Sequence, residues 1–403
     1  MTRSVAITGM GAISAAGLGV GALWQAARSG RSGIGPIALP RATSNRVLIG
    51  GAIAHFDPAA HIDPGLLRLS DPYAQYALYA AAEAISASGL EPAELRNERT
   101  AAIIGTGVGG IGSLDVGAFH YYQGQKFDTF SVPRTMPSSG ASLVSIAHGI
   151  TGPTFAVSSA CASGSQAIGM AAGMIKAGLI DRAVVGGAEA CLTPATMRAW
   201  EYLRVLSPDA CRPFSLGRTG MVIGDGAGVF VLEAADVMAS RGGRALAWLS
   251  GYGTSSDARD MVQPDADGAA RAVRAALADA ALAPVSIGYI NAHGTGTVLN
   301  DITEAAALRE VFGEVLDTIP VSSSKPIIGH ALGAAGALEL AITVEALREQ
   351  VVPPQINCLE QDPRCRLWLP TDAPTPHAFT AALSNSFAFG GINAALIVTA
   401  APR

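Results

Sequence analysis

The sequence predicts an α/β fold in which strands and helices form stacked layers. Short apolar runs, most of which end at turn residues, alternate with Ala-rich stretches of helical length, and this alternation is typical of layered α/β proteins. Hydrophobic residues make up 49% of the 403 residues and charged residues only 15%, which indicates extensive burial. The second half of the chain also repeats the order of elements in the first half.

Ten short apolar runs are predicted as strands, because each has strand length and most are bounded by Gly, Ser or Asn. In chain order they are Val5–Thr8, Ala101–Ile104, Phe155–Ser158, Ala183–Val185, Val229–Leu232, Ala245–Ser250, Ile287–Asn291, Ile319–Ser322, Ala381–Ser384 and Ala394–Val398. Five longer stretches are predicted as helices: Tyr73–Ser88, Gly164–Ala177, Gly268–Ala281, Asp301–Phe312 and Gly336–Glu349.

The two halves resemble distant copies of one unit. In each half an apolar strand ends in paired serines, turns towards a helix rich in small residues, and is followed by another apolar strand. Phe-Ala-Val-Ser-Ser-Ala-Cys161 begins this pattern in the first half, and Pro-Val-Ser-Ser-Ser-Lys325 begins it in the second. We place the passage between halves near residues 240–250, which gives units 1–245 and 246–403. Since no low-complexity linker separates them, we expect one compact body.

Bulk properties exclude several classes of protein. Between Arg134 and Lys176 no residue carries a full charge, but prolines and glycines interrupt the stretch, so a span of about 20 apolar residues is not expected. The N-terminal segment lacks a signal-peptide pattern. We therefore predict a soluble, cytoplasmic protein with a large apolar subunit interface. The net charge of −5 disfavours general nucleic-acid binding.

The five cysteines are widely spaced and odd in number, which argues against a disulfide framework, and no pattern indicates zinc. Cys161 differs from the others because it lies where a predicted strand meets a predicted helix. The N–H groups and partial positive charge of a helix N-terminus favour a thiolate and can hold an oxyanion. The alternative is a buried, inert thiol. A serine nucleophile is less expected because Gly-x-Ser-x-Gly is absent.

Two histidines follow predicted strands in the second half. His293 lies in Asn-Ala-His-Gly-Thr295-Gly-Thr297, directly after a strand, where ligand-binding groups collect in α/β folds. Lys325 and His330 lie in a segment of otherwise small or apolar residues. A buried lysine needs a partner, and Glu339 is the nearest acidic residue downstream. The alternative for this segment is a helix start with incidental polar groups.

A glycine turn near the C-terminus completes the set of candidate residues. Phe387 and Phe389 are followed by Gly-Gly, so the turn has free N–H groups, and Phe389 can supply an oxyanion donor and a movable aromatic wall. Neither this turn nor the glycines after Thr106 follow a nucleotide-binding pattern. One cysteine, two histidines, a lysine and a glycine turn together suit acyl transfer through a covalent thioester.

These blocks, in this order, resemble the elongating β-ketoacyl-acyl-carrier-protein synthases of type II systems over nearly the whole chain. The matching blocks include Val-Ala-Ile-Thr-Gly-Met-Gly, the Cys161 turn, Gly-Gly-Ala-Glu189, Asn-Ala-His293-Gly-Thr, Ser-Lys325-Pro-Ile-Ile-Gly-His330 and Asn-Ser-Phe-Ala-Phe389-Gly-Gly. Cys211-Arg-Pro-Phe-Ser and Ala388 are also similar to nodulation and type II polyketide ketosynthases. The resemblance implies a thiolase-like fold of five layers (α-β-α-β-α) and a homodimer.

The resemblance also implies a role for each candidate residue. Cys161 would receive an acyl group from acyl carrier protein, and His293 and His330 would assist malonyl decarboxylation and stabilise the enolate. The N–H groups of Cys161 and Phe389 would form the oxyanion hole, and Lys325 paired with Glu339 would support the site through charge. No metal or other cofactor is implied, since the substrates travel on phosphopantetheine. Residues implied at the substrate are Thr295, Thr297, Phe387, Phe389, Trp200 and Val108.

Some residues depart from the pattern of this family. Ala388 replaces the usual glycine of the turn and is expected to stiffen it. The segment around Arg68 lacks most of the basic residues with which primary-metabolism enzymes contact an acidic carrier; Arg68 and Arg204 remain. A dedicated pathway carrier is therefore our hypothesis for the partner. The acyl chain length, its saturation and the pathway do not follow from the sequence.

Two other functions were weighed. A degradative thiolase would use a second cysteine in a Cys-x-Gly setting, which Cys358 and Cys365 lack. A non-catalytic subunit resembling a chain-length factor would lack the nucleophile, whereas Cys161, His293 and His330 are all present. A heterodimer of this chain with such a subunit stays open beside the homodimer.

Overall fold

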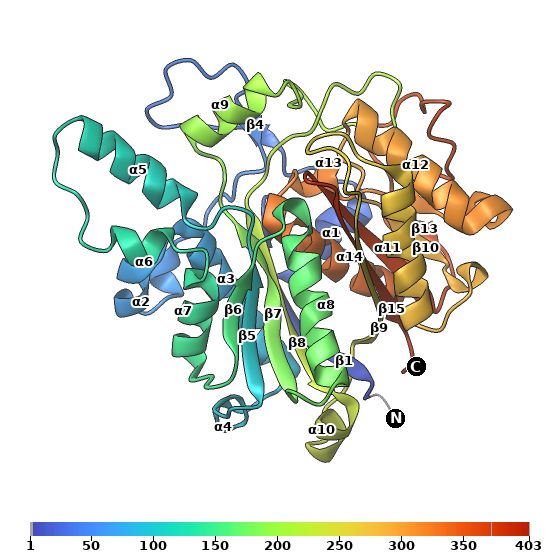
Figure 1. Ribbon diagram of the computed structural model, residues 1–403, viewed down its shortest axis with the longest axis horizontal. Helices are drawn as coiled ribbons and strands as arrows, with labels where there is room; N and C mark the ends of the chain where they lie inside the picture. The colour runs from blue at the N-terminus through green and yellow to red at the C-terminus, as the bar shows by residue number, and fades with distance from the viewer. Residues whose placement is uncertain (1–2, 372, 403) are drawn as a thin grey trace.

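A computed structural model describes residues 3–371 and 373–402; most of its strands belong to one continuous hydrogen-bonded network with helices on both faces, and two short two-stranded pairs lie apart from it (Figure 1). The strand order is β11-β10-β14-β15-β9-β1-β8-β7-β5-β6, with β2 paired to β1. The strands of the first half are β1 (Val5–Ser14), β5 (Thr100–Gly105), β6 (Thr154–Val157), β7 (Arg182–Glu189) and β8 (Gly226–Ala234). Those of the second half are β9 (Ala247–Ser256), β10 (Tyr289–Asn291), β11 (Val321–Ser322), β14 (Ala381–Ala388) and β15 (Ile392–Thr399).

The two halves share one topology. In the first half β5 pairs in parallel with β6 and β7, whereas β7–β8 and β8–β1 are antiparallel. In the second half β10 pairs in parallel with β11 and β14, whereas β14–β15 and β15–β9 are antiparallel. Only two register pairs, Ala6–Trp248 and Ile7–Ala247, join the halves through β1 and β9. Each half is therefore a sheet unit of its own, and the two meet edge to edge.

Helices complete five layers. The helices α3 (Pro72–Ser88) and α7 (Ser139–His148) cover the outer face of the first half, and α11 (Ala266–Asp279) and α12 (Val298–Phe312) cover the outer side of the second. Between them lie α8 (Ser163–Lys176) and α14 (Ala335–Glu349), which contact each other and strands of both halves. The predicted α-β-α-β-α architecture is confirmed.

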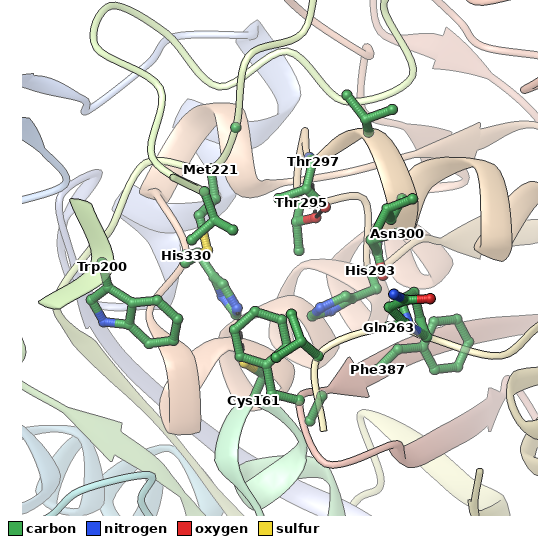
Figure 2. A pocket seen from close by; sticks show the side chains of 18 of the residues that line it. Cys161, Trp200, Met221, Gln263, His293, Thr295, Thr297, Asn300, His330 and Phe387 are labelled. Atoms are coloured by element: carbon green, nitrogen blue, oxygen red, sulfur yellow. Dashed lines mark hydrogen bonds between the residues drawn. The ribbon is translucent and has the colours of Figure 1, made fainter. Parts of the chain in front are cut away.

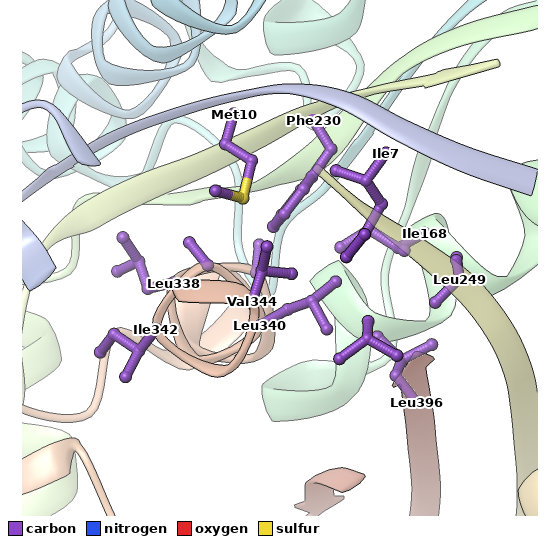
Figure 3. Close-up of a cluster of buried hydrophobic side chains, with 14 of the residues drawn as sticks. Ile7, Met10, Ile168, Phe230, Leu249, Leu338, Leu340, Ile342, Val344 and Leu396 are labelled. Atoms are coloured by element: carbon purple, nitrogen blue, oxygen red, sulfur yellow. The ribbon is translucent and has the colours of Figure 1, made fainter. Parts of the chain in front are cut away.

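Small residues let the central helices approach the strands closely. A Cβ added at Gly228 on β8 would lie 2.8 Å from the carbonyl carbon of Ala337 on α14. Larger apolar side chains from β1, β8, α8 and α14 then fill one core, in which Met10, Phe230, Ile168 and Leu340 meet (Figure 3). The buried residues of α14 run without interruption from 335 to 347, as befits a helix enclosed on all sides.

All ten predicted strands and all five predicted helices occur. The uncharged stretch after Arg134 folds as α7, β6 and α8, and no helix in the described ranges is long and apolar enough to cross a membrane. Elements that the sequence did not reveal include α1 (Val20–Ser29), α5 (Ile111–Tyr122), α6 (Ser131–Thr135) and α9 (Pro194–Tyr202); α5 and α6 project from one side (Figure 1). The shorter elements are β2 (Gly17–Leu18), β3 (Gly35–Pro36), β4 (Ile49–Gly50), α2 (Pro64–Leu69), α4 (Pro92–Leu95), α10 (Ala235–Ser240), α13 (Lys325–Ile328), β12 (Val351–Val352), β13 (Thr375–Pro376) and the 3₁₀ turns η1 (Pro58–Ala60), η2 (Ala160–Ala162), η3 (Pro284–Ser286), η4 (Gly313–Thr318) and η5 (Leu332–Ala334).

Candidate active site

Cys161 lies at a sharp turn between β6 and α8. The preceding residue, Ala160, has a φ of 48°, a conformation that L residues rarely adopt, and η2 leads from it into α8. The turn presents the Cys161 sulfur to a cavity at the N-terminal end of α8, while the side chain remains only 7% exposed. Such a strained strand-to-helix turn holds a nucleophile in place.

His330 contacts the cysteine directly. Its Nε2 lies 3.1 Å from Cys161 Sγ, and its Nδ1 has no protein partner among the described residues. Since the ring has no second hydrogen bond, its position depends on the backbone. The His330 N–H donates to Val222 O at 2.6 Å, and His330 O accepts from Gly224 N at 3.0 Å.

His293 lies beside His330 and is oriented by Lys325. The two imidazole rings are 5.4 Å apart and nearly perpendicular. Lys325 Nζ lies 3.2 Å from His293 Nδ1, donates to His293 O, and lies 2.5 Å from Glu339 Oε1. Because the ammonium group can only donate, His293 Nδ1 accepts and the ring proton lies on Nε2. The Lys325–Glu339 pair is fully buried, so the pairing predicted from the sequence is present.

Burial sets the protonation of the three reactive groups. It lowers the pKa of both His293 and His330 well below 6.5, and Lys325 lowers them further, so both rings are neutral near pH 7. Burial also raises the pKa of Cys161 to about 12, although the charge of Lys325 opposes this rise. The sequence led us to expect a thiolate at the helix N-terminus. Burial opposes this expectation, because the loss of hydration raises the pKa of the thiol.

Figure 2 shows that Cys161, His293 and His330 converge on one cavity of about 260 Å³. Its walls are mainly apolar, and Met261, Val262, Val298 and Leu299 line its exposed rim. Seven further residues that the sequence analysis connected with this site or its carrier also line the cavity: Thr295, Thr297, Trp200, Phe387, Ala388, Phe389 and Arg204. Thr295 and Thr297 share a hydrogen bond of 2.9 Å between their hydroxyl groups.

The glycine turn after β14 forms one wall. Gly390 and Gly391 have φ values of 82° and 66°, which only glycine adopts readily, and Gly390 N donates to Met261 O at 2.8 Å. The Phe389 ring lies 5.7 Å from the Trp200 ring and is tilted by 31°. Phe389 therefore packs against Trp200 of α9 in the wall of the cavity.

Two predicted residues do not line the cavity. Val108 is 44% exposed, because the chain after β5 turns outward into α5. Its assignment to the substrate pocket is therefore not supported by this structure. Arg68 lies on α2 in a separate hollow, with its guanidinium group 4.9 Å from the Phe130 ring centre.

Two buried carboxylates in the site were not predicted. Glu304 on α12 accepts from the N–H groups of His293 and Gly294, each at 2.8 Å, and burial raises its pKa to about 7. Glu189, at the end of β7, accepts hydrogen bonds from the backbone N–H groups of Gly107 and Gly333. The sequence places Glu189 in a recognisable Gly-Gly-Ala-Glu block, but spacing alone does not reveal which N–H groups it meets.

Four buried oxygens near the Lys325–Glu339 pair lack protein partners among the described residues: Asn291 Oδ1, Glu339 Oε2, Ser384 Oγ and Asn385 Oδ1. Amide, hydroxyl and carboxylate oxygens can hold water or a small hard cation. Within the described ranges no group of three or more His, Cys, Asp or Glu side chains could hold a metal ion.

Comparisons with known proteins agree with this geometry. The β-ketoacyl synthase N-terminal domain matches residues 2–237, and the β-ketoacyl synthase C-terminal domain matches residues 246–359. Nodulation protein E of Rhizobium sp. (strain N33) is 40% identical over 98% of this chain and 99% of its own length. The 3-oxoacyl-[acyl-carrier-protein] synthase 2 of Staphylococcus aureus (strain COL) is 35% identical over 98% of each chain.

A solved structure, the ishigamide ketosynthase/chain length factor, superposes with a TM-score of 0.96 at 32% identity and covers 100% of both chains. The family domains together match well over half of the chain, and the similarity to each relative extends over nearly its whole length. The chain therefore belongs to the β-ketoacyl synthase family.

Proposed function

We propose that this protein is an elongating β-ketoacyl-acyl-carrier-protein synthase, an acyltransferase that joins an acyl group on Cys161 to a malonyl unit in fatty-acid or type II polyketide synthesis. One observation carries the proposal. A thiol and two neutral imidazoles from different halves of the chain face one apolar cavity, with Cys161 Sγ 3.1 Å from His330 Nε2.

In the first step Cys161 attacks the acyl thioester of the carrier. The sulfur passes its proton towards His330 Nε2 as the new S–C bond forms, and the carrier thiol leaves with a proton. The N–H groups of Cys161 and Phe389 are the donors that we assign to the oxyanion. The products are acyl-Cys161 and free carrier thiol, so no net proton is consumed.

In the second step a malonyl thioester loses CO₂ beside the two imidazoles. The electrons of the broken C–C bond form an enolate, whose oxygen accepts hydrogen bonds from Nε2–H of His293 and from His330 in the tautomer that carries its proton on Nε2. Lys325 fixes the His293 tautomer that makes this donation possible. Neutral imidazoles suit this task, since no strong base is needed when CO₂ departs.

In the third step the enolate carbon attacks the acyl-Cys161 carbonyl. A C–C bond forms, the S–C bond breaks, and the Cys161 thiolate takes one proton from solvent to restore the thiol, so the condensation consumes one proton. The product is a β-ketoacyl thioester on the carrier. The sequence of steps needs no redox cofactor, and we assign no cofactor to the protein.

The partner is an acyl carrier protein, and the rim of the cavity supports this assignment. Met261 and Leu299 expose 73% and 54% of their surface there, and Arg204 supplies a cation at the same mouth. A rim that is more apolar than basic fits a dedicated pathway carrier. Thr295 and Thr297 line the same cavity, and we assign them to the pantetheine arm. Arg68 is a second carrier contact in this proposal.

We also propose a dimer in the cytoplasm, either with a second copy or with a related subunit. The apolar side chains of α5 and α6 support an interface, since Tyr122 and Val132 are 82% and 69% exposed. A non-catalytic subunit does not account for the Cys161–His330 contact, so that alternative is the weaker one for this chain.

Intact-mass measurement tests the proposed function. The purified protein is incubated with carriers that bear acyl chains from short saturated to long polyene. We expect a mass increase equal to one acyl group, which maps to Cys161 and is absent in Cys161→Ala. No acyl load from any carrier, with the fold intact, would favour the non-catalytic subunit.

A further inference from the structure

Glu189 holds four donors from two separate segments around the nucleophile. Its Oε1 accepts from Thr106 Oγ1 at 2.9 Å and from Val108 N at 3.4 Å. Its Oε2 accepts from Gly107 N at 2.6 Å and from Gly333 N at 2.9 Å. The side chain is fully buried and no cation among the described residues pairs with it, so its hydrogen bonds are what make its burial tolerable.

The first segment, residues 106–108, is hydrogen-bonded to residues that flank Cys161 in the sequence. Ser163 Oγ donates to Thr106 O at 3.3 Å, and Ser158 Oγ donates to Gly107 O at 3.2 Å. Thr106 N in turn donates to Val157 O. Residues on either side of Cys161 are therefore tied to the loop that Glu189 holds.

The second segment, residues 331–333, follows His330 directly. Leu332 has a φ of 43°, which is strained for a leucine, and the next residue is Gly333. Since His330 Nδ1 has no partner in the described part of the chain, the placement of its ring depends on the backbone at either side. Val222 and Gly224 fix the backbone of His330 itself, and Glu189 fixes the turn that follows.

The close approach of these segments requires glycine at both contact points. A Cβ at Gly107 would lie 2.8 Å from Glu189 Oε2, and a Cβ at Gly333 would lie 2.6 Å from the same oxygen. Gly333 also occupies, in η5 of the second half, the place that Cys161 has in η2 of the first. One carboxylate thus connects the turn that carries the nucleophile to its counterpart beside His330.

We propose that Glu189 is a positioning residue that fixes the distance between Cys161 Sγ and His330 Nε2 by clamping the segments 106–108 and 331–333 together. It acts through these backbones and does not touch substrate. The inference rests on the proposed function for its consequence in turnover, but the clamp itself can be measured without any carrier substrate.

The test compares Glu189→Gln with a matched control, Glu233→Gln. Glu233 is equally buried, on the neighbouring strand β8, and accepts from Thr8, Arg182 and Arg241 away from the cavity. The second-order rate constant for alkylation of Cys161 by iodoacetamide is measured for each folded variant. We expect Glu189→Gln to lower it by about 10- to 100-fold, the scale of a small misplacement of reacting groups, and Glu233→Gln to leave it unchanged.

Turnover provides the second readout. We expect Glu189→Gln to lower kcat by a similar factor and to leave KM within about twofold, because substrate contacts are retained. If Glu189→Gln does not fold, Thr106→Val tests the clamp instead, because it removes one of the four donors to Glu189. We then expect the alkylation rate constant to fall by about two- to tenfold. The proposal is overturned if Glu189→Gln is alkylated at the wild-type rate or if Glu233→Gln loses as much alkylation rate as Glu189→Gln. Where Glu189→Gln does not fold, it is overturned if Thr106→Val has no effect. Lack of condensation by the wild-type protein would instead contradict the proposed function.

Discussion

At Cys161, burial and the neighbouring imidazole determine the chemistry more than the end of α8 does. The thiol has a pKa of about 12, and the His330 ring 3.1 Å away stays neutral because its own pKa is lowered. The resting pair is thus thiol and imidazole, without separated charge. The proton leaves the sulfur only as a thioester is attacked, which limits side reactions of an exposed thiolate.

This pairing predicts the pH dependence of alkylation. Since the pKa of Cys161 is raised, the thiolate fraction increases with pH throughout the neutral range, and the alkylation rate rises about tenfold per pH unit between pH 7 and 9. A stopped assay with iodoacetamide across that range measures it. A plateau above pH 7 would show a preformed thiolate–imidazolium pair and contradict the neutral one.

Lys325 and Glu339 predict an asymmetric effect on stability. Both are fully buried and lie 2.5 Å apart, so Lys325→Met leaves Glu339 as an unpaired buried carboxylate. We expect a loss of about 3–5 kcal/mol in the free energy of unfolding, measured in urea.

The double variant Lys325→Met/Glu339→Gln recovers much of this loss, because no buried charge remains. As a control, Arg271→Ala breaks an exposed i, i+4 pair with Asp267 and changes stability by less than about 0.5 kcal/mol. If the stability loss of the double variant equalled the sum of the losses in Lys325→Met and in Glu339→Gln, the result would contradict the pairing.

The residues that act by their own chemistry could be predicted from the sequence. Cys161 and His293 each follow a predicted strand, where reactive groups collect, His330 lies in the same small-residue segment as Lys325, and Lys325 needed an acidic partner. Glu304 could not be predicted, because it binds N–H groups whose direction depends on the fold. Val108 does not line the described cavity and is exposed after β5, so its place at the substrate stays a prediction.

At the scale of elements, two helices with small residues form the centre of the molecule. Ser165 on α8 and Ser386 on β14 share a hydrogen bond of 2.8 Å, and Gly336 on α14 packs over it. A Cβ at Gly336 would lie 2.0 Å from Ser165 Oγ and 2.6 Å from Ser386 Oγ. This contact keeps α14, α8 and the strand that leads to Phe389 in one register.

Two helix glycines therefore predict opposite signs for the same substitution. Gly336→Ala overpacks the contact and is expected to lower the free energy of unfolding by about 1–3 kcal/mol. Gly173→Ala, on α8 with open space at its Cβ, is expected to raise it by about 0.5–1 kcal/mol. Thermal or urea unfolding measures both, and a stabilising Gly336→Ala would refute the close packing.

The central elements were predictable because their patterns are strong, whereas the projecting ones were not. In the sequence, buried strands are recognisable as apolar runs bounded by turn residues, and the run of small residues in α14 indicates a helix. The helix α5 contains Gly112 and Gly117 and buries only Gly117, so its sequence lacks the two-sided pattern of a surface helix.

For the whole molecule, the matching topology of the two halves explains why the reactive groups meet. Strand ends of both sheets point to the same region, so that Cys161 comes from the first half and both histidines from the second. The internal repeat was visible in the sequence through its paired serines. The halves are joined through only two residue pairs of β1 and β9. This junction depends on tertiary packing, so it was not visible in the sequence.

The apolar surface of α5 and α6 predicts association in solution. We expect sedimentation of a dimer, in which Val132 is covered, and dissociation to a monomer in Val132→Glu because a buried charge is costly. Leu359→Glu is the control, since Leu359 is 94% exposed and belongs to neither helix, so its substitution should not change the dimer. A monomeric wild type, or a dimer unaffected by Val132→Glu, would contradict the interface.

A single-turnover experiment tests the central claim most directly. Protein loaded with an acyl group on Cys161 is mixed with malonyl-carrier, and both masses are followed with time. We expect the protein to return to its unloaded mass as the carrier gains the acyl group and loses CO₂, and we expect this exchange to be abolished in His293→Ala/His330→Ala. Persistence of the acyl-Cys161 in the wild-type protein, or equal turnover in the double variant, would contradict a condensing site built from these three side chains.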